Sequence, residues 1–411
     1  MRVVVTGMGA VAPNGNSVSE YWDALVAGQS GIDHITYFDT TDFPVKIAGE
    51  VSNFDPEQYF ERKEVRKLDP FSVYALVASN EAIYMSGLDA GGFDPQRAGV
   101  MLGCGIGGIT TILAEHVVLQ NRGARRISPF FVTKLIANIA GGQIAIKWDL
   151  RGPNQTITSA CASATDAIGL ALRLIQSGSA DIMVAGGTEA SICDLPLAGF
   201  STIRALCNAA DPPQSASRPF DKDRRGFVMG EGSGILVLET EEHAQSRGAT
   251  ILGELAGYGS TNDAFHVTKP AEGGAGAVKA MQLALEDAGA EPEEVDYINA
   301  HGTSTPYNDK NETAAIKTVF GDHARKLKIS STKSMTGHLL GASGGIEAIA
   351  ALKAIEKQTI PPTINYTTPD PDCDLDYVPN TAEEAQVNSV LSNTFGFGGH
   401  NAVIFMRKWQ D

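Results

Sequence analysis

Cysteine is scarce in this 411-residue sequence, and its few cysteines are not spaced for a disulfide framework or a zinc site. The five are scattered at positions 104, 161, 193, 207 and 373, with no C-x-x-C pair. An odd, dispersed set of this kind predicts a reduced protein of the cytoplasm that binds no metal. The N-terminus lacks the apolar core and cleavage site of a signal peptide, which agrees with that location.

Positive charge and long apolar runs are also lacking. The chain has 32 Lys and Arg against 48 Asp and Glu, which gives a net charge of −16. This balance argues against a nucleic-acid partner, because such binding needs a basic footprint. No apolar run approaches the roughly 18 residues of a membrane span, so we expect no membrane association. With 43% hydrophobic residues, the chain has ample material for a large core.

Strand-like and helix-like segments alternate along most of the chain. Short apolar runs near glycine-rich turns lie at 2–7, 98–103, 154–159, 180–187, 251–260 and 295–302. Helical patterns lie between them, for example at 277–289 and 311–321. This alternation predicts an α/β protein with mostly parallel strands.

The two parts of the chain echo each other weakly. Residues 156–178 are read as a strand, a small-residue turn and an Ala/Leu/Ile helix, and residues 328–358 repeat the pattern with a longer turn. We therefore predict two similar halves, 1–250 and 251–411. Because no linker-like segment separates them, they should pack as one body.

The glycine-rich segment 103–108, GCGIGG, fits the dinucleotide pattern G-x-G-x-x-G and follows a strand-like run. A dinucleotide site also needs an acidic residue roughly 20 positions further on. No Asp or Glu occurs between His116 and Trp148. A tight turn that brings backbone close to a pocket is the better interpretation.

Cys161 stands between a β-branched run and the start of a helix, in TITSACASATDAIG. Backbone N–H groups and the helix dipole favour a thiolate at such a position, which suits a nucleophile. A small buried cysteine at a tight junction would give the same local pattern.

Two further motifs hold candidate catalytic groups. His301 follows an apolar strand, at the end where α/β proteins bind ligands, although it could instead bond its own loop. Lys333, His338 and Glu347 lie within 15 residues, on the segment that echoes the one bearing Cys161. If a pseudo-two-fold relates the halves, Cys161 and these groups meet at the centre.

Phe395 and Phe397 lie in the C-terminal segment NTFGFGGHNAVIF, where glycines separate and follow them. This pattern indicates a mobile flap, or backbone N–H groups close to a reaction centre. A simple turn with two core phenylalanines is the alternative.

Together these motifs resemble those of the β-ketoacyl-acyl carrier protein synthases, and more narrowly the synthase II type of bacterial fatty acid synthesis. The resemblance spans the chain. It rests on the segments 3–15, 105–108, 127–132, 150–154, 158–163, 183–190, 218–239, 299–306, 330–342 and 395–401. It implies a duplicated thiolase-like fold with layers in the order α-β-α-β-α, and a homodimer.

The resemblance also implies a mechanism and the residues that carry it. Cys161 takes an acyl chain from acyl carrier protein as a thioester. Malonyl-acyl carrier protein then loses CO₂, and its carbanion attacks that thioester. His301 and His338 would stabilise the malonyl thioester oxygen, while the N–H groups of Cys161 and Phe397 form the oxyanion hole for the attack. Lys333 supports the histidines electrostatically, paired with Glu347.

By the same resemblance, Ile106 limits the depth of the acyl pocket, and Phe395 and Phe397 gate it. No cofactor is needed, because the phosphopantetheine arm arrives with the carrier protein. Some relatives carry a structural alkali ion, for which the sequence alone gives no evidence. Carrier protein is acidic, so we expect it to dock on local basic groups, although each could be an ordinary solvated face: Lys63, Arg66, Lys67, Arg125, Arg126 and Arg204.

Two positions depart from the family pattern. Many relatives have Thr where this chain has Ser159, and some have Thr where it has His400, which makes His400 a poor catalytic candidate. Neither changes the Cys–His–His set. A thiolase would need a second cysteine near the C-terminus, and a synthase III would have Asn at His338. A polyketide-type ketosynthase subunit or a non-catalytic partner subunit stays open, although the latter should have lost Cys161.

Overall fold

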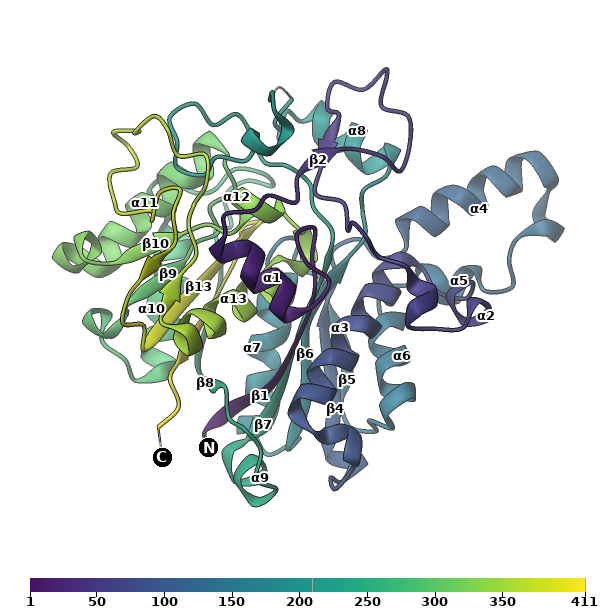
Figure 1. Cartoon of the computed structure of the whole chain (residues 1–411), viewed down its shortest axis with the longest axis horizontal. Helices are drawn as coiled ribbons and strands as arrows, with labels where there is room; N and C mark the ends of the chain where they lie inside the picture. The colour runs from purple at the N-terminus through teal and green to yellow at the C-terminus, as the bar shows by residue number, and fades with distance from the viewer. Residues whose placement is uncertain (209, 411) are drawn as a thin grey trace.

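The computed structural model describes residues 1–208 and 210–410, which form a mixed sheet of ten strands with helices on its faces (Figure 1). The sheet begins with strands of the second half. They run in the order β10 (Lys328–Ser330), β9 (Tyr297–Asn299), β13 (Ser389–Gly396), β14 (His400–Arg407) and β8 (Gly253–Asn262). Strands of the first half follow. They run in the order β1 (Val3–Val11), β7 (Gly232–Thr240), β6 (Ile182–Glu189), β4 (Ala98–Gly103) and β5 (Asn154–Ile157).

The two halves repeat one strand topology. In the first half β4 pairs parallel with β5 and β6, and β7 pairs antiparallel with β6 and β1. In the second half β9 pairs parallel with β10 and β13, and β14 pairs antiparallel with β13 and β8. Parallel pairing thus holds only for the outer strands. Strands such as β7 are buried on both faces, so their composition does not reveal the direction of pairing.

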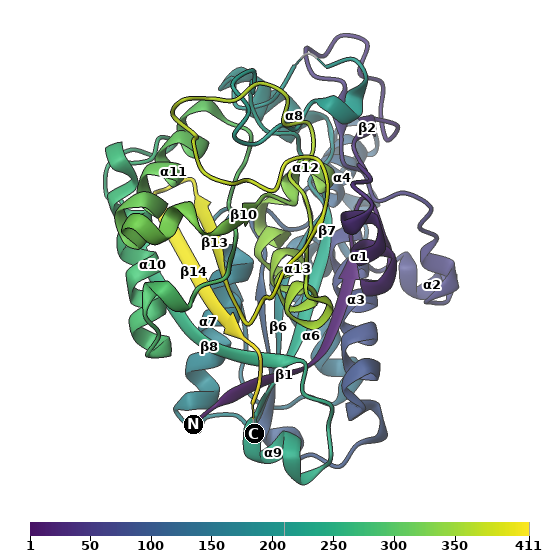
Figure 2. The same cartoon turned by 60° about the vertical axis from the view of Figure 1, so that its left-hand side comes forward.

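Helices lie between the two halves of the sheet and on the outer face of each half, which gives five layers in the order helix, strand, helix, strand, helix (Figure 2). The two helices that follow the catalytic motifs, α7 (Ser163–Gln176) and α13 (Ser343–Lys357), pack between the halves and contact strands of both. The outer face of the first half carries α3 (Pro70–Ser86) and α6 (Ile139–Trp148). The outer face of the second carries α10 (Ala275–Ala288) and α11 (Pro306–Phe320). The predicted duplicated α/β fold is confirmed.

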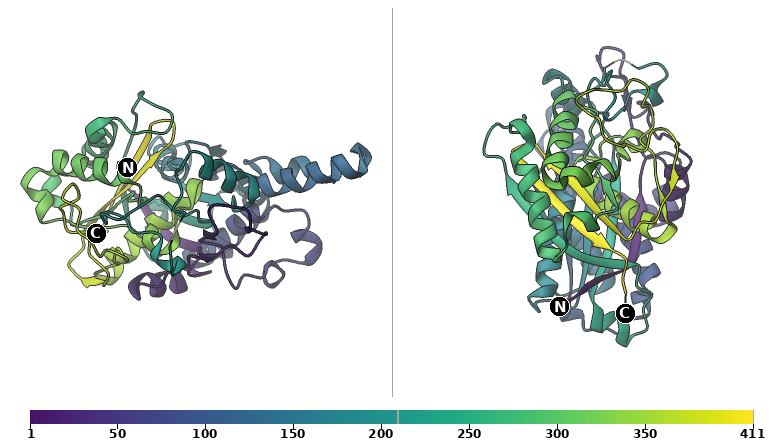
Figure 3. Two further views of the ribbon diagram at one scale, coloured as in Figure 1. Left: turned by 90° about the horizontal axis from the view of Figure 1, so that it is seen from above. Right: turned by 90° about the vertical axis from the view of Figure 1, so that its left-hand side faces the viewer.

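Shorter elements lie around these layers. One helix, α4 (Ile109–Arg122), projects from the body as an arm (Figures 1 and 3). The others are α1 (Val18–Val26), α2 (Arg62–Val65), α5 (Phe131–Leu135), α8 (Asp194–Thr202), α9 (Glu241–Ser246) and α12 (Lys333–Thr336). Two small ribbons pair β2 (Asp33–His34) with β3 (Ile47–Ala48), and β11 (Thr359–Ile360) with β12 (Glu383–Glu384). In the described ranges, no helix has the length and apolar character needed to cross a membrane.

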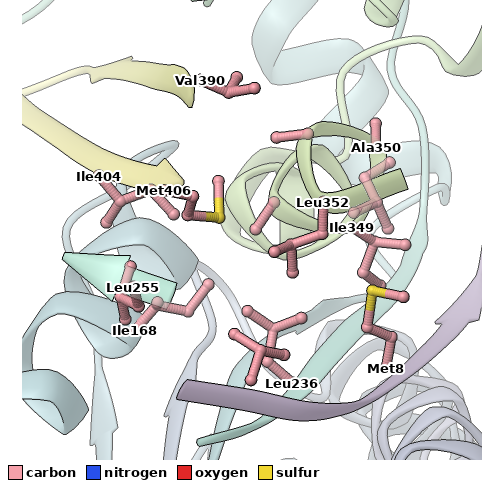
Figure 4. Packing of buried hydrophobic residues seen from close by; sticks show 14 of the residues in the cluster. Met8, Ile168, Leu236, Leu255, Ile349, Ala350, Leu352, Val390, Ile404 and Met406 are labelled. Atoms are coloured by element: carbon pink, nitrogen blue, oxygen red, sulfur yellow. The ribbon is translucent and has the colours of Figure 1, made fainter. Parts of the chain in front are cut away.

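The largest hydrophobic cluster joins the two halves (Figure 4). It brings together Leu236 of β7, Ile168 of α7, Ile349 of α13 and Ile404 of β14, all fully buried. Since this cluster draws on both halves, neither half could bury its inner face alone. The core is therefore shared between strands and helices of both halves.

Candidate active site

Cys161 lies on the turn between β5 and α7, two residues before the helix begins. Ala160 just before it has a φ of 52°, a left-handed conformation that is uncommon for a residue with a side chain. Ser163 braces the turn, because its hydroxyl donates to the Ala160 carbonyl at 2.6 Å and accepts the Ser159 N–H at 2.9 Å. The sulfur consequently faces a cavity of about 460 Å³, which His301, His338, Phe395 and Phe397 also line.

His338 contacts Cys161 directly. Its Nε2 lies 2.9 Å from Cys161 Sγ. Its Nδ1 accepts the Leu340 N–H at 3.3 Å and lies 2.8 Å from the Ser343 hydroxyl. Because a backbone N–H can only donate, Nδ1 carries no proton, and the neutral ring holds its proton on Nε2. His338 therefore presents an N–H donor to the cavity.

His301 lies beside His338, with 5.4 Å between ring centroids. It follows β9, and the carboxylate of Glu312 on α11 accepts the N–H groups of His301 and Gly302, each at 2.8 Å. Burial lowers the pKa of both histidines well below the ordinary value, and the Lys333 charge lowers them further. Both rings are therefore neutral at physiological pH.

The sequence did not single out Glu312, which fixes the backbone at His301. Its pKa is raised to about 7 by burial, although the hydrogen bonds from Gly302, His301 and Asn393 oppose that shift. No sequence motif links Glu312 to His301, since the contact depends on where α11 lies against the loop after β9.

Lys333 and Glu347 form an ion pair with side chains only 2% and 1% exposed. Lys333 begins α12 and Glu347 lies in the first half of α13, and the Lys333 ammonium donates to a Glu347 carboxylate oxygen. Burial raises the pKa of Glu347, and the Lys333 charge is the largest influence in the other direction. The predicted pairing of these two residues is thus present.

The helix start favours the Cys161 thiolate only in part, and it does not ionise the thiol of the resting protein. Burial raises the pKa of the thiol to about 11. The Lys333 charge and the N–H groups of Phe397 and of Cys161 itself act in the opposite direction but do not outweigh burial. The resting thiol is therefore protonated, within a ring of donors that would stabilise negative charge.

The hairpin turn between β13 and β14 brings Phe397 to the nucleophile. Gly396 packs so closely that a Cβ there would lie 2.9 Å from the Ser159 carbonyl oxygen and 3.1 Å from the Cys161 nitrogen. Phe397 lies 6.4 Å from Phe200 between ring centroids, and Phe395 lies 5.7 Å from His301. Both phenylalanines thus border the cavity, and Phe395 also packs against the core of the second half.

Ile106 lines the same cavity and is 38% exposed. The loop that carries it is held by Glu189, whose carboxylate accepts the N–H groups of Gly105 at 2.8 Å and Ile106 at 3.2 Å. Since a carboxylate of the protein already takes these donors, the loop offers them to no phosphate. This agrees with its interpretation as a tight turn beside a pocket.

The basic groups considered for docking lie in three places. Arg204 lines the cavity, while Arg125 and Arg126 form a 3₁₀ turn after the α4 arm. Lys63, Arg66 and Lys67 lie on and beside α2. There Lys63 pairs with Glu61 at 2.7 Å, and the Lys67 ammonium lies 5.7 Å from the Phe130 ring centre. His400 begins β14 and is not among the cavity residues.

Two family models match the chain. The β-ketoacyl synthase N-terminal domain matches residues 1–244, and the C-terminal domain matches residues 252–367. The chain is 51% identical to 3-oxoacyl-[acyl-carrier-protein] synthase 2 of Staphylococcus aureus, over all of this chain and 99% of that protein. The protein of the same name from Synechocystis is also 51% identical, over all of this chain and 98% of that one.

Solved structures of ketosynthases have the same fold. A β-ketoacyl synthase from Burkholderia phymatum superposes with a TM-score of 0.92 at 36% identity, over the full length of both chains. A type II polyketide ketosynthase in complex with its acyl carrier protein gives a TM-score of 0.89 at 38% identity, over 100% of this chain and 99% of that one. The full-length matches, the fold and the grouping of Cys161 with two neutral histidines agree, and the chain belongs to the β-ketoacyl synthase family.

Proposed function

We propose that this protein catalyses the decarboxylating condensation of malonyl-acyl carrier protein with an acyl chain held on Cys161. The product is a β-ketoacyl-acyl carrier protein, two carbons longer than the acyl primer, in fatty acid elongation. The observation that carries the proposal is the 2.9 Å contact between Cys161 Sγ and the protonated Nε2 of His338, inside a cavity shared with His301. The 51% identity to the synthase 2 proteins favours fatty acids over polyketides, whose ketosynthases match at 38%.

In the first step Cys161 Sγ attacks the thioester carbonyl of acyl-carrier protein. A C–S bond to Cys161 forms, the C–S bond to phosphopantetheine breaks, and the thiol proton leaves with the departing thiol. Three N–H donors lie at the sulfur, the Nε2–H of His338 and the backbone N–H groups of Cys161 and Phe397, and the buried Lys333 ammonium adds positive charge nearby. They lower the cost of a transient thiolate and of the oxyanion that follows.

In the second step malonyl-carrier protein enters and loses CO₂. The electron pair of the broken C–C bond moves onto the malonyl thioester. The thioester oxygen then accepts hydrogen bonds from the N–H groups of His301 and His338. Neutral imidazoles suit this role, because each offers a donor without binding the carboxylate as a salt bridge would. The carbanion then attacks the Cys161 thioester, the sulfur leaves as a thiolate, and a proton from solvent restores the resting thiol. Phe395 and Phe397 would gate the two steps, and Ile106 would limit the acyl chain.

The same proposal includes acyl carrier protein as partner, bound at least in part by the cations on and beside α2. It requires no cofactor, and it places the enzyme in the cytoplasm. A second copy of the chain would cover the free edge of β5, where exposed apolar groups gather on the neighbouring helices: Val117, Val132 and Ile146. Sedimentation at twice the 43.3 kDa chain mass would support this dimer, and the monomer mass would exclude it.

Three buried oxygens fit the alkali ion that some relatives carry. Asn299 Oδ1, Ser392 Oγ and Glu347 Oε2 have no hydrogen-bond partner among the residues described. Asn299 and Ser392 are register partners on β9 and β13, and α13, which carries Glu347, packs against both strands. Hard oxygen ligands of this kind suit a cation that neutralises charge and fixes the loops around the histidines.

Cys161→Ala tests the proposal. The variant should fold, because alanine fits a tight junction, but it should neither form an acyl-enzyme nor elongate acyl-carrier protein. The acyl-enzyme is measured as a mass increase on Cys161, and elongation from labelled malonyl-carrier protein. Cys207→Ala is the matched control and should keep both activities. Elongation by Cys161→Ala at the rate of the unmodified protein would end the proposed mechanism.

A further inference from the structure

The carboxylate of Asp166 receives hydrogen bonds from both halves of the protein. It lies in the first turn of α7 and is 7% exposed. Within its own half, the Ser159 hydroxyl donates to its Oδ2 at 2.5 Å. From β8 of the other half, the hydroxyls of Tyr258 and Ser260 donate to Oδ1 at 2.5 Å and 3.2 Å. Asp166 therefore connects the nucleophile turn to the second half.

The turn that this carboxylate reaches is strained. Ser159 is the residue before Ala160, whose positive φ persists only if the surroundings enforce it. The Ser159 carbonyl accepts the Ala162 N–H at 3.1 Å, so Ser159 is hydrogen-bonded across Cys161 to the start of α7. A shift of Ser159 would consequently move both the Cys161 sulfur and its N–H group. Ser159 is also one of the two positions at which the sequence departs from the family pattern.

Tyr258 is itself held firmly. Its ring packs against α7 at Gly169, where a Cβ would lie 2.2 Å from a ring atom. The guanidinium of Arg173 lies 5.9 Å from the ring centre. Asp287 on α10 accepts both the Tyr258 N–H at 2.9 Å and an Arg173 N–H at 2.7 Å. With its ring and backbone fixed, Tyr258 can place its hydroxyl on Asp166 without a large entropic cost.

We infer that Asp166 and Tyr258 are positioning residues that hold the nucleophile turn in its reactive geometry from across the two halves. Neither residue is among the groups that line the cavity, so they act through Ser159 and not on the substrate. The inference deepens the proposed function, because it rests on Cys161 as the nucleophile. It predicts slower acylation of Cys161 with an unchanged KM for acyl-carrier protein.

Tyr258→Phe tests this inference, with Tyr377→Phe as its matched control. Tyr377 is also a tightly packed buried tyrosine, stacked on Phe220 at 4.0 Å, and its hydroxyl lies 2.8 Å from that of Thr313, away from the cavity. Each variant loses one hydrogen-bonded tyrosine hydroxyl, and the melting temperature of each is measured beside its acylation rate to report any loss of stability. Single-turnover acylation at saturating acyl-carrier protein should slow about tenfold in Tyr258→Phe and stay unchanged in the control.

A graded series at Asp166 separates positioning from simple loss of packing. Asp166→Asn keeps an oxygen for Ser159 and offers an amide donor to the Tyr258 oxygen, so it should retain most of the acylation rate that Asp166→Ala loses. Ser159→Ala combined with Tyr258→Phe should be less harmful than the product of the two single effects, because both act through one carboxylate. Equal acylation rates in Tyr258→Phe and Tyr377→Phe would overturn the inference.

A failure of the proposed function would give a different result. If the unmodified protein formed no acyl-enzyme on Cys161, the proposed function itself would be wrong. The rate of Cys161 alkylation by iodoacetamide would then still test the positioning role of Asp166 and Tyr258, because it reports the exposure and reactivity of the sulfur without any acyl transfer. An alkylation rate in Tyr258→Phe that differs from the rate in Tyr377→Phe would support the positioning role, and equal alkylation rates would reject it.

Discussion

Replacing Lys333 with methionine should destabilise the protein through Glu347. The two side chains are 2% and 1% exposed, and their ion pair lies beside the two active-site histidines. Methionine fills a similar volume without charge, so the main consequence is a buried carboxylate without its cation. Breaking a buried pair in this way costs about 3–5 kcal/mol, because the remaining buried carboxylate has lost the ammonium that is hydrogen-bonded to it.

The size of this loss should depend on pH. Burial already raises the pKa of Glu347, and Lys333 is the main group that opposes the rise. Without Lys333 the pKa of Glu347 rises further in the folded state, while in the unfolded chain it stays near 4.3. Between those two values the folded protein binds more protons than the unfolded chain, so its stability falls as the pH rises. The loss should therefore be smaller at pH 5 than at pH 8.

Urea unfolding at pH 5 and pH 8 measures this effect in the unmodified protein, Lys333→Met, Glu347→Gln and the double variant. The double variant has no buried charge at the pair, so it should be more stable than the sum of the single losses predicts. A loss in Lys333→Met that is equal at both pH values, together with additive single effects, would refute the idea that an unpaired Glu347 carboxylate causes the destabilisation.

Three further predictions concern the separate steps of the reaction. Cys161→Gln should release CO₂ from malonyl-carrier protein without an acyl primer, because its amide oxygen can occupy the oxyanion hole while the histidines still face malonate; release no faster than in His301→Ala would contradict this. Ile106→Phe should shift acylation toward shorter chains, since a larger side chain overfills the pocket; an unchanged chain-length profile by mass would exclude Ile106 from it. Reversing the charges of Lys63, Arg66 and Lys67 should reduce kcat/KM for acyl-carrier protein more than for acyl-coenzyme A, by about 1–3 kcal/mol at low salt and less at high salt. Equal losses with both donors would place the docking surface elsewhere.

The sequence predicted the positions of the reactive groups because strand ends in an α/β fold are informative. Cys161 follows β5, the outermost strand of the first half. His301 follows β9, which lies next to the outermost strand of the second half. Ligand sites form where such strands end. Two similar halves with their helices between them then bring Cys161 and the echoing segment around His338 together, so the pattern indicated the grouping, whereas the roles of these residues came from the family resemblance.

The supporting contacts could not be predicted in the same way. Glu312 lies 11 residues after His301, and Tyr258 lies 92 residues after Asp166, with nothing in either segment to indicate a partner. Such contacts depend on how a helix or strand lies against a loop, which periodicity does not specify. Antiparallel pairing of the inner strands was missed for a related reason, since a strand buried on both faces has no directional pattern.

The protonation of Cys161 shows why local sequence also failed at the nucleophile itself. A helix start lowers a thiol pKa only by partial charges at the end of the helix. In this fold the same residue lies between two halves, and burial raises the pKa to about 11. The donors that oppose burial come from elsewhere in the chain: Phe397 on the C-terminal hairpin and Lys333 on α12. The charged state of Cys161 is consequently stabilised by its own N–H group together with groups of the second half, and the same N–H groups would stabilise the oxyanion formed during acyl transfer.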